Sequence, residues 1–153
     1  MNVTGILHVN INCSDFDRSR QFYEMLGFRV LMPVQPDGSA DAAAAVGMVG
    51  YQVRGALMRH RDGSVIDLLE WQDPRDEQAP YDRLNHLGIA RLAFVTTDID
   101  SDMERLSAEG VEFLSRGPAF VEGPGGHTTR FICFRDPDGT VLELVEMGTE
   151  QDA

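Results

Sequence analysis

The sequence has few cysteines, few basic side chains and no long apolar segment, and each shortage argues against a class of protein. Its two cysteines, Cys13 and Cys133, have no CxxC spacing, which favours buried reduced thiols over a disulfide or a zinc site. Lys and Arg number 13 against 25 Asp and Glu, which argues against a nucleic-acid partner. No apolar run approaches the roughly 20 residues of a membrane span. The N-terminus lacks the pattern of a signal peptide, so we expect a cytosolic protein.

The composition that remains is that of one globular domain. Hydrophobic residues make up 42% and charged residues 25% of 153 residues, enough to bury a core. The net charge of −12 favours a solvated acidic surface and also suits a cationic ligand.

The first half of the chain reads as strand, helix and three strands. A strand is predicted at 6–13, because apolar and polar residues alternate from Leu7 onward. Leu7, Val9, Ile11 and Cys13 are expected to face a core, and His8, Asn10 and Asn12 the opposite side. A helix capped by Ser14 or Asp15 ends at Gly27. The other predicted elements are strands at 28–32, 53–59 and 64–71 and a short helix after Ser39, inserted within 33–50.

After a linker at about 72–86 the same order restarts. Ser101 and Glu104 match a capping box for a helix that begins at Asp100 or Ser101 and ends at Gly110. The strands predicted in this half are 88–97, 111–115, 128–134 and 140–147.

The two halves also match residue by residue. The stretch ending at His8 aligns with the stretch ending at Arg91, at the same offset that relates Asp15 to Asp98 (91 − 8 = 83, 98 − 15 = 83). Near the end of each half the offset is smaller (143 − 67 = 76), so the first half carries about seven extra residues, which the insertion at 33–50 absorbs. We therefore predict two tandem modules, at about 4–71 and 87–148.

Three stretches of the sequence together resemble the vicinal-oxygen-chelate superfamily, the glyoxalase, bleomycin-resistance and extradiol-dioxygenase type. They are His8 to Asp15, the helix from Asp17 to Phe28, and the segment from Arg135 to Glu146. The resemblance implies an α+β fold in which two βαβββ modules form curved sheets around a cup-shaped cavity for a small molecule. It also implies a homodimer, and it leaves the reaction open, because one such scaffold hosts many chemistries.

In such proteins the first and last strands of each module supply the metal ligands, which here correspond to His8, Asp67, Arg91 and Glu143. Imidazole and carboxylates suit divalent Fe, Mn, Zn or Ni, and no organic cofactor is expected. Arg91 departs from the family's usual histidine, and a guanidinium cannot ligate a metal. The predicted ligands are therefore His8, Asp67 and Glu143.

Two functions stay open. In the first, the protein is a metal-dependent isomerase, epimerase, lyase or dioxygenase acting on a small oxygenated substrate, with Glu143 and Asp67 as catalytic carboxylates. In the second, it is a metal-free binding protein in which Arg91 pairs with a cavity carboxylate or grips a ligand. The retained ligand-type residues favour the enzyme. The residues predicted to contact substrate are Arg91, Asn10, Asn12, Trp71 and His127, the last in a glycine-rich loop.

Overall fold

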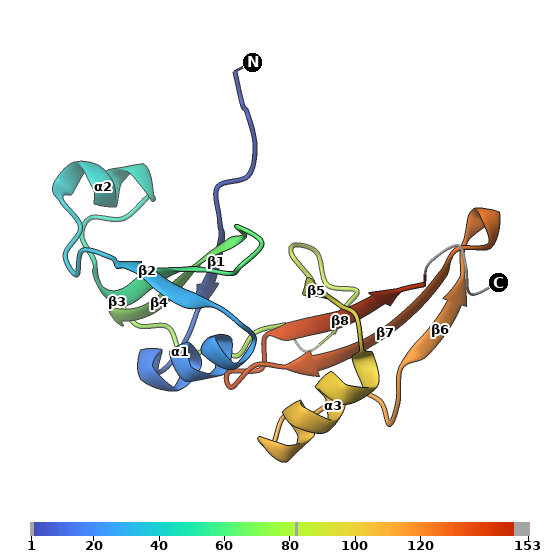
Figure 1. Cartoon of the computed structure of the whole chain (residues 1–153). Helices are drawn as coiled ribbons and strands as arrows, with labels where there is room; N and C mark the ends of the chain where they lie inside the picture. Colours follow the sequence, from blue (N-terminus) through green and yellow to red (C-terminus); the bar gives the residue numbers. More distant parts are fainter. Residues whose placement is uncertain (1, 82, 149–153) are drawn as a thin grey trace. The chain divides into compact units, whose positions relative to one another are not determined.

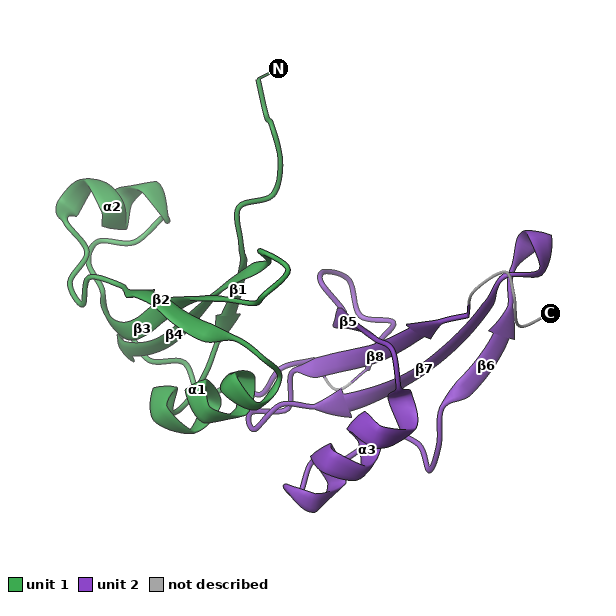
Figure 2. Ribbon diagram, viewed as in Figure 1, with its two compact units in different colours: residues 1–78 green, residues 79–153 purple. Residues whose placement is uncertain are grey.

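The computed structural model describes residues 2–81 and 83–148. The chain divides into two compact units, residues 1–78 (unit 1) and 79–153 (unit 2), shown in Figure 2. Unit 1 contains β1 (Val9–Asn12), α1 (Phe16–Met25), β2 (Arg29–Pro33), α2 (Ala40–Ala45), β3 (Gln52–Arg59) and β4 (Val65–Asp73). Unit 2 contains β5 (Leu92–Thr96), α3 (Ile99–Ala108), β6 (Ala119–Glu122), the 3-10 helix η1 (Pro124–Gly126), β7 (Thr128–Arg135) and β8 (Val141–Met147). Among the described residues no helix is long and apolar enough to cross a membrane.

The two units repeat one topology. Unit 1 has the strand order β1-β4-β3-β2 and unit 2 has β5-β8-β7-β6. In each sheet the first strand runs parallel to the last, and the other pairs are antiparallel. The predicted α+β fold of two tandem βαβββ modules is confirmed, with α1 following β1 and α3 following β5 (Figure 1).

The core of unit 1 lies between α1 and the sheet. Asp15 caps α1, since its side chain accepts a hydrogen bond from the Arg18 backbone N–H at 3.1 Å. Gly27, at φ +98°, ends the helix in a conformation that favours glycine. The largest fully buried side chains of this unit are Tyr23, Phe28, Met58, Ile66 and Leu68. On β4, Ile66 and Leu68 are buried and alternate with half-buried neighbours, so Asp67 points away from α1.

Unit 2 is built in the same way around α3. Its core side chains are Ile99, Leu106, Ile132, Phe134, Leu142 and Leu144. On β8 the residues from Val141 to Leu144 are all buried, so here both faces of the strand are covered. Glu143 belongs to this run and is one of the few buried charged residues.

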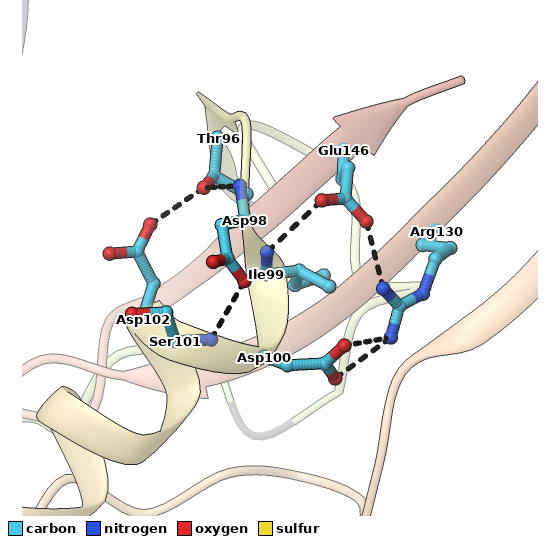
Figure 3. A network of polar contacts seen from close by, with 8 residues as sticks. All are labelled: Thr96, Asp98, Ile99, Asp100, Ser101, Asp102, Arg130 and Glu146. Carbon is cyan, nitrogen blue, oxygen red and sulfur yellow. Dashed lines mark hydrogen bonds and ion pairs between the residues drawn. The ribbon is translucent and has the colours of Figure 1, made fainter. Parts of the chain in front are cut away.

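A glutamate on β4 anchors α1, and a glutamate on β8 anchors α3. In unit 2, Glu146 Oε1 accepts a hydrogen bond from the buried Ile99 N–H at 3.2 Å, and its Oε2 accepts one from Arg130 Nη1 at 2.9 Å. Nη2 of Arg130 donates to both carboxylate oxygens of Asp100, at 2.8 and 2.9 Å (Figure 3). The first turn of α3 is thereby tied to β7 and β8.

The equivalent anchor in unit 1 is looser. Glu70 Oε2 accepts a hydrogen bond from Phe16 N–H at 3.1 Å, which repeats the Glu146 contact. Arg54, however, bonds Asp17 at 2.7 Å, and both of those side chains are about half exposed. The helix of each unit therefore begins at a strand carboxylate, a contact that supports the alignment of the two modules.

Five details of the sequence prediction are wrong, and one is the strand expected at 88–97, of which only β5 from Leu92 to Thr96 forms. The first strand is shorter than expected, and Leu7, predicted to face the core, is 78% exposed. Helix α3 begins earlier, because Asp98 and not Ser101 provides the cap by accepting from the Ser101 N–H at 3.0 Å. The expected strand at 111–115 contributes only an isolated bridge of Phe113 to Phe134, and the sheet is completed by β6. Finally, β4 continues to Asp73, beyond the strand end predicted at residue 71.

Candidate functional site

Strand pairing brings the predicted site residues together in two pairs, one in each unit. In unit 1 the parallel register places Asn10 opposite Asp67, so His8 precedes β1 close to that carboxylate. In unit 2 it places Ala93 opposite Glu143, which brings Arg91 to the corresponding position. These registers reproduce the offsets of 83 and 76 residues between the halves (93 − 10 = 83, 143 − 67 = 76).

The unit 1 pair consists of an imidazole and a carboxylate with one unused oxygen. Nε2 of His8 lies 4.0 Å from Oδ2 of Asp67, and the two side chains are 35% and 17% exposed. Oδ1 of Asp67 is buried and has no hydrogen-bond partner among the described residues. Burial raises the pKa of the Asp67 carboxyl, and the charge of His8 opposes this shift only in part. A buried carboxylate oxygen without a donor is costly, and a cation or a proton removes that cost.

The unit 2 pair is an ion pair. Nε of Arg91 donates to Oε2 of Glu143 at 3.0 Å, and the side chains are 40% and 8% exposed. The second oxygen of Glu143 lies 3.9 Å from Sγ of Cys133, its neighbour on β7. Burial raises the pKa of the Cys133 thiol, the negative charge of Glu143 raises it further, and Arg91 opposes both effects.

Aromatic and amide side chains lie further along the unit 1 sheet. Nε1 of Trp71 donates to Oδ1 of Asn12 at 2.9 Å, and the indole meets the Tyr51 ring edge-on, with centroids 5.4 Å apart. Nδ2 of Asn10 donates to the backbone oxygen of Asp67 at 2.8 Å, which joins β1 to β4 beside the carboxylate. Asn12 and Asn10, both predicted to contact substrate, thus use a side-chain group to hold Trp71 and β4 in place.

His127 lies at the turn between β6 and β7. It is exposed and follows η1, where Gly125 and Gly126 both have φ near +80°. Its backbone oxygen accepts a hydrogen bond from Gly123 N–H at 2.7 Å, which closes the turn. The substrate role of His127 stays a prediction.

Unit 1 supplies two donors of the kind that a divalent ion takes, and the pair in unit 2 does not. His8 and Asp67 offer a ring nitrogen and an unused buried oxygen, which are ligands of the kind that divalent ions take. In unit 2 the guanidinium of Arg91 occupies the position beside Glu143 that a cation would need. Across residues 2–81 and 83–148, no group of three or more His, Cys, Asp and Glu is placed to hold an ion.

Sequence reasoning missed two residues of this arrangement, Tyr51 and Cys133. The turn at Asp62-Gly63 could have predicted the position of Tyr51. It sets the register of the β3–β4 hairpin, in which Val53 pairs with Trp71 and Tyr51 lies two residues before Val53 in the chain. Cys133 was expected to be a buried thiol, which it is. Its position beside Glu143 depends on the pairing of β7 with β8, which a single strand pattern does not determine.

Comparisons with known proteins agree with this architecture. A model of the Glyoxalase/Bleomycin resistance protein/Dioxygenase superfamily matches residues 5–144. A Synechocystis protein named probable lactoylglutathione lyase is 30% identical over 151 residues, covering 96% of this chain and 98% of that protein. A Bacillus subtilis protein without a described function is 29% identical over 147 residues, 95% of this chain and 99% of its own length. The crystal structure of a glyoxalase family protein from Bacillus cereus superposes with a TM-score of 0.77 at 24% identity, covering 97% and 99% of the two chains.

Proposed function

Because this chain belongs to the Glyoxalase/Bleomycin resistance protein/Dioxygenase superfamily, we propose that it is an enzyme acting on a small oxygenated substrate and that His8 and Asp67 bind a divalent ion. The observation that carries this proposal is the carboxylate of Asp67. Its Oδ1 is buried and has no hydrogen-bond partner among the described residues, and its Oδ2 lies 4.0 Å from Nε2 of His8. The lactoylglutathione lyase names of two relatives, 30% and 27% identical, favour lyase chemistry.

Each residue has a distinct task in this proposal. A bound ion would stabilise negative charge that develops on a substrate oxygen. His8 supplies a neutral nitrogen ligand, and Asp67 supplies a negatively charged oxygen ligand. Asn10 holds β1 against β4 at the level of Asp67, so the two ligands keep their spacing.

Glu143 has a different position in the proposal. Its participation as a third ligand, and as a catalytic carboxylate, requires that Arg91 release Oε2. The bond of 3.0 Å between them specifically favours the second candidate function, a metal-free binding protein in which Arg91 replaces a metal ligand.

Metal titration separates the two candidates. Calorimetry with manganese, zinc, nickel and ferrous iron should show stoichiometric binding to the wild-type chain, and His8→Ala and Asp67→Asn should abolish it. Asp41→Asn is the matched control, since it makes the same change at an exposed carboxylate of unit 1 and should leave this binding in place. Wild-type protein that binds none of the four ions would overturn the metal site and leave the metal-free candidate. Lactoylglutathione lyase activity, measured with and without the ion that binds, is the direct test of chemistry.

A further inference from the structure

We infer that the sheet face that carries Asp67 also carries an aromatic subsite, formed by Trp71 and Tyr51, that selects ligands with a flat ring. The inference rests on the proposed function only for the oxygen-bearing end of the ligand, which belongs at His8 and Asp67. Both aromatic side chains are half-buried, so each still presents part of its ring to the surroundings.

The hydrogen bonding of Trp71 determines what it offers a ligand. Its single donor, Nε1–H, is used by Oδ1 of Asn12 at 2.9 Å, so the indole has no free polar group. Tyr51 meets it at an interplanar angle of 62°, an edge-to-face contact that covers a face of one ring and leaves the opposite face of that ring for stacking on a ligand. Asn12 is therefore a positioning residue that fixes the indole, and recognition occurs through stacking.

The inserted segment of unit 1 holds Tyr51 in place. Gly38 donates its N–H to the backbone oxygen of Tyr51 at 3.2 Å, and Asp37 forms a bridge with Gln52. A Cβ at residue 38 would lie 2.3 Å from Cε1 of Tyr51, so only glycine allows the backbone to lie against that ring. The insertion that distinguishes unit 1 from unit 2 thus supports the aromatic pair.

Polarity changes in order along β4. Asp67, Leu69 and Trp71 share one face, so a carboxylate is followed by an aliphatic and then an aromatic side chain. Gly55 lies opposite Leu69, and a Cβ there would lie 2.7 Å from the leucine side chain, so the glycine provides the space that Leu69 fills. At about 3.3 Å per residue, Asp67 and Trp71 are roughly 13 Å apart. This order fits an elongated ligand with oxygen at one end and a planar ring at the other.

Unit 2 provides an internal contrast. The offset of 76 residues that relates β4 to β8 places Met147 at the position of Trp71 and His127 at that of Tyr51 (71 + 76 = 147, 51 + 76 = 127). Met147 has an aliphatic side chain, so no ring pair forms with the imidazole of His127, and both residues are exposed. The aromatic pair is therefore a property of unit 1 and not of the repeated fold.

The test uses 2-naphthol as a neutral ring probe and decahydro-2-naphthol as its saturated control, with chelator present. Calorimetry should show saturable binding of 2-naphthol to the full chain, and at least several-fold weaker binding of the saturated alcohol. Tyr51→Leu should weaken 2-naphthol binding roughly two- to ten-fold, the scale of an aromatic pair, and Tyr51→Phe should retain it. Tyr81→Leu makes the same change at an exposed tyrosine of unit 2 and should have no effect.

Trp71 is the single tryptophan of the chain, so its fluorescence reports on this subsite alone. Saturating 2-naphthol should quench the Trp71 fluorescence. In the free protein, Asn12→Ala should shift the Trp71 emission and lower its anisotropy. Asn12→Asp keeps an acceptor for the indole N–H and should keep the wild-type spectrum. Equal affinity for the planar and the saturated alcohol, or equal effects of Tyr51→Leu and Tyr81→Leu, would overturn the inference. Because no metal is present, a failed metal titration removes the proposed ion site without affecting this result.

Discussion

Replacing Arg91 tests whether unit 2 depends on the ion pair between Arg91 and Glu143. Arg91→Ala would leave the Glu143 carboxyl at 8% exposure without the guanidinium that now contacts it. Breaking a fully buried pair costs about 3–5 kcal/mol, whereas an exposed pair contributes about 0–1 kcal/mol. Because Arg91 itself is 40% exposed, we expect an intermediate loss of about 2 kcal/mol in the free energy of unfolding.

Urea denaturation of four proteins measures this loss and assigns it to the pair. Arg91→Ala should lower the midpoint at unchanged slope, and Glu143→Gln added to it should recover most of the stability, because it removes the uncompensated charge. Arg116→Ala is the control, an exposed arginine of the same unit, expected to change stability by less than about 0.5 kcal/mol. An Arg91→Ala variant as stable as Arg116→Ala would show that Glu143 does not need the guanidinium, and the argument from their bond would fail.

Three further predictions concern the carboxylates. Glu146→Ala should destabilise the chain by about 1–3 kcal/mol, because it leaves the buried Ile99 N–H without an acceptor; thermal unfolding that matches wild type would contradict this. In chelator, Asp67→Asn should be more stable than wild type above the raised pKa of Asp67, and this difference in stability should disappear as the pH falls through that pKa. A difference that persists in acid would show that burial of the charged carboxylate is not its cause. The Ser64 backbone N–H, and then His60, lower the pKa of Asp62 to about 2. The ionised Asp62 carboxylate therefore stabilises the fold above its usual pKa of 3.8, and this stabilisation is lost as the pH falls from 3.8 to about 2. The pH profiles of unfolding of wild type and Asp62→Asn should converge over that range.

The fold was predictable because its signals are local and occur twice. The alternation on either side of Asp67, the glycine at residue 27 and the turn at Asp62-Gly63 each determine a strand or a helix end without distant contacts. The repeat then fixed the module order. The strand expected at 111–115 was wrong because this segment forms only an isolated bridge, between Phe113 and Phe134. A pattern of alternating residues does not distinguish such a bridge from a paired strand.

The candidate site was predictable in its composition and less so in its contacts. The resemblance to the superfamily named His8, Asp67, Arg91 and Glu143 as site positions, and the structure brings them together in two pairs, one within each unit. The sequence left open whether Arg91 meets a carboxylate or a ligand, because a guanidinium at the end of a flexible side chain can reach either. Tyr51 was missed because its position depends on the inserted segment, whose course no periodic pattern describes.

The two residue pairs illustrate how a duplicated scaffold can diversify. Backbone hydrogen bonds between parallel strands set the separation of residues 8 and 67, and of 91 and 143, whatever side chains occupy those positions. A mutation that exchanges a ring nitrogen for a guanidinium therefore changes the chemistry of one half while the other half and both sheets persist. The chain has His8 beside Asp67 in one unit and Arg91 beside Glu143 in the other, so one repeated backbone presents two different chemistries.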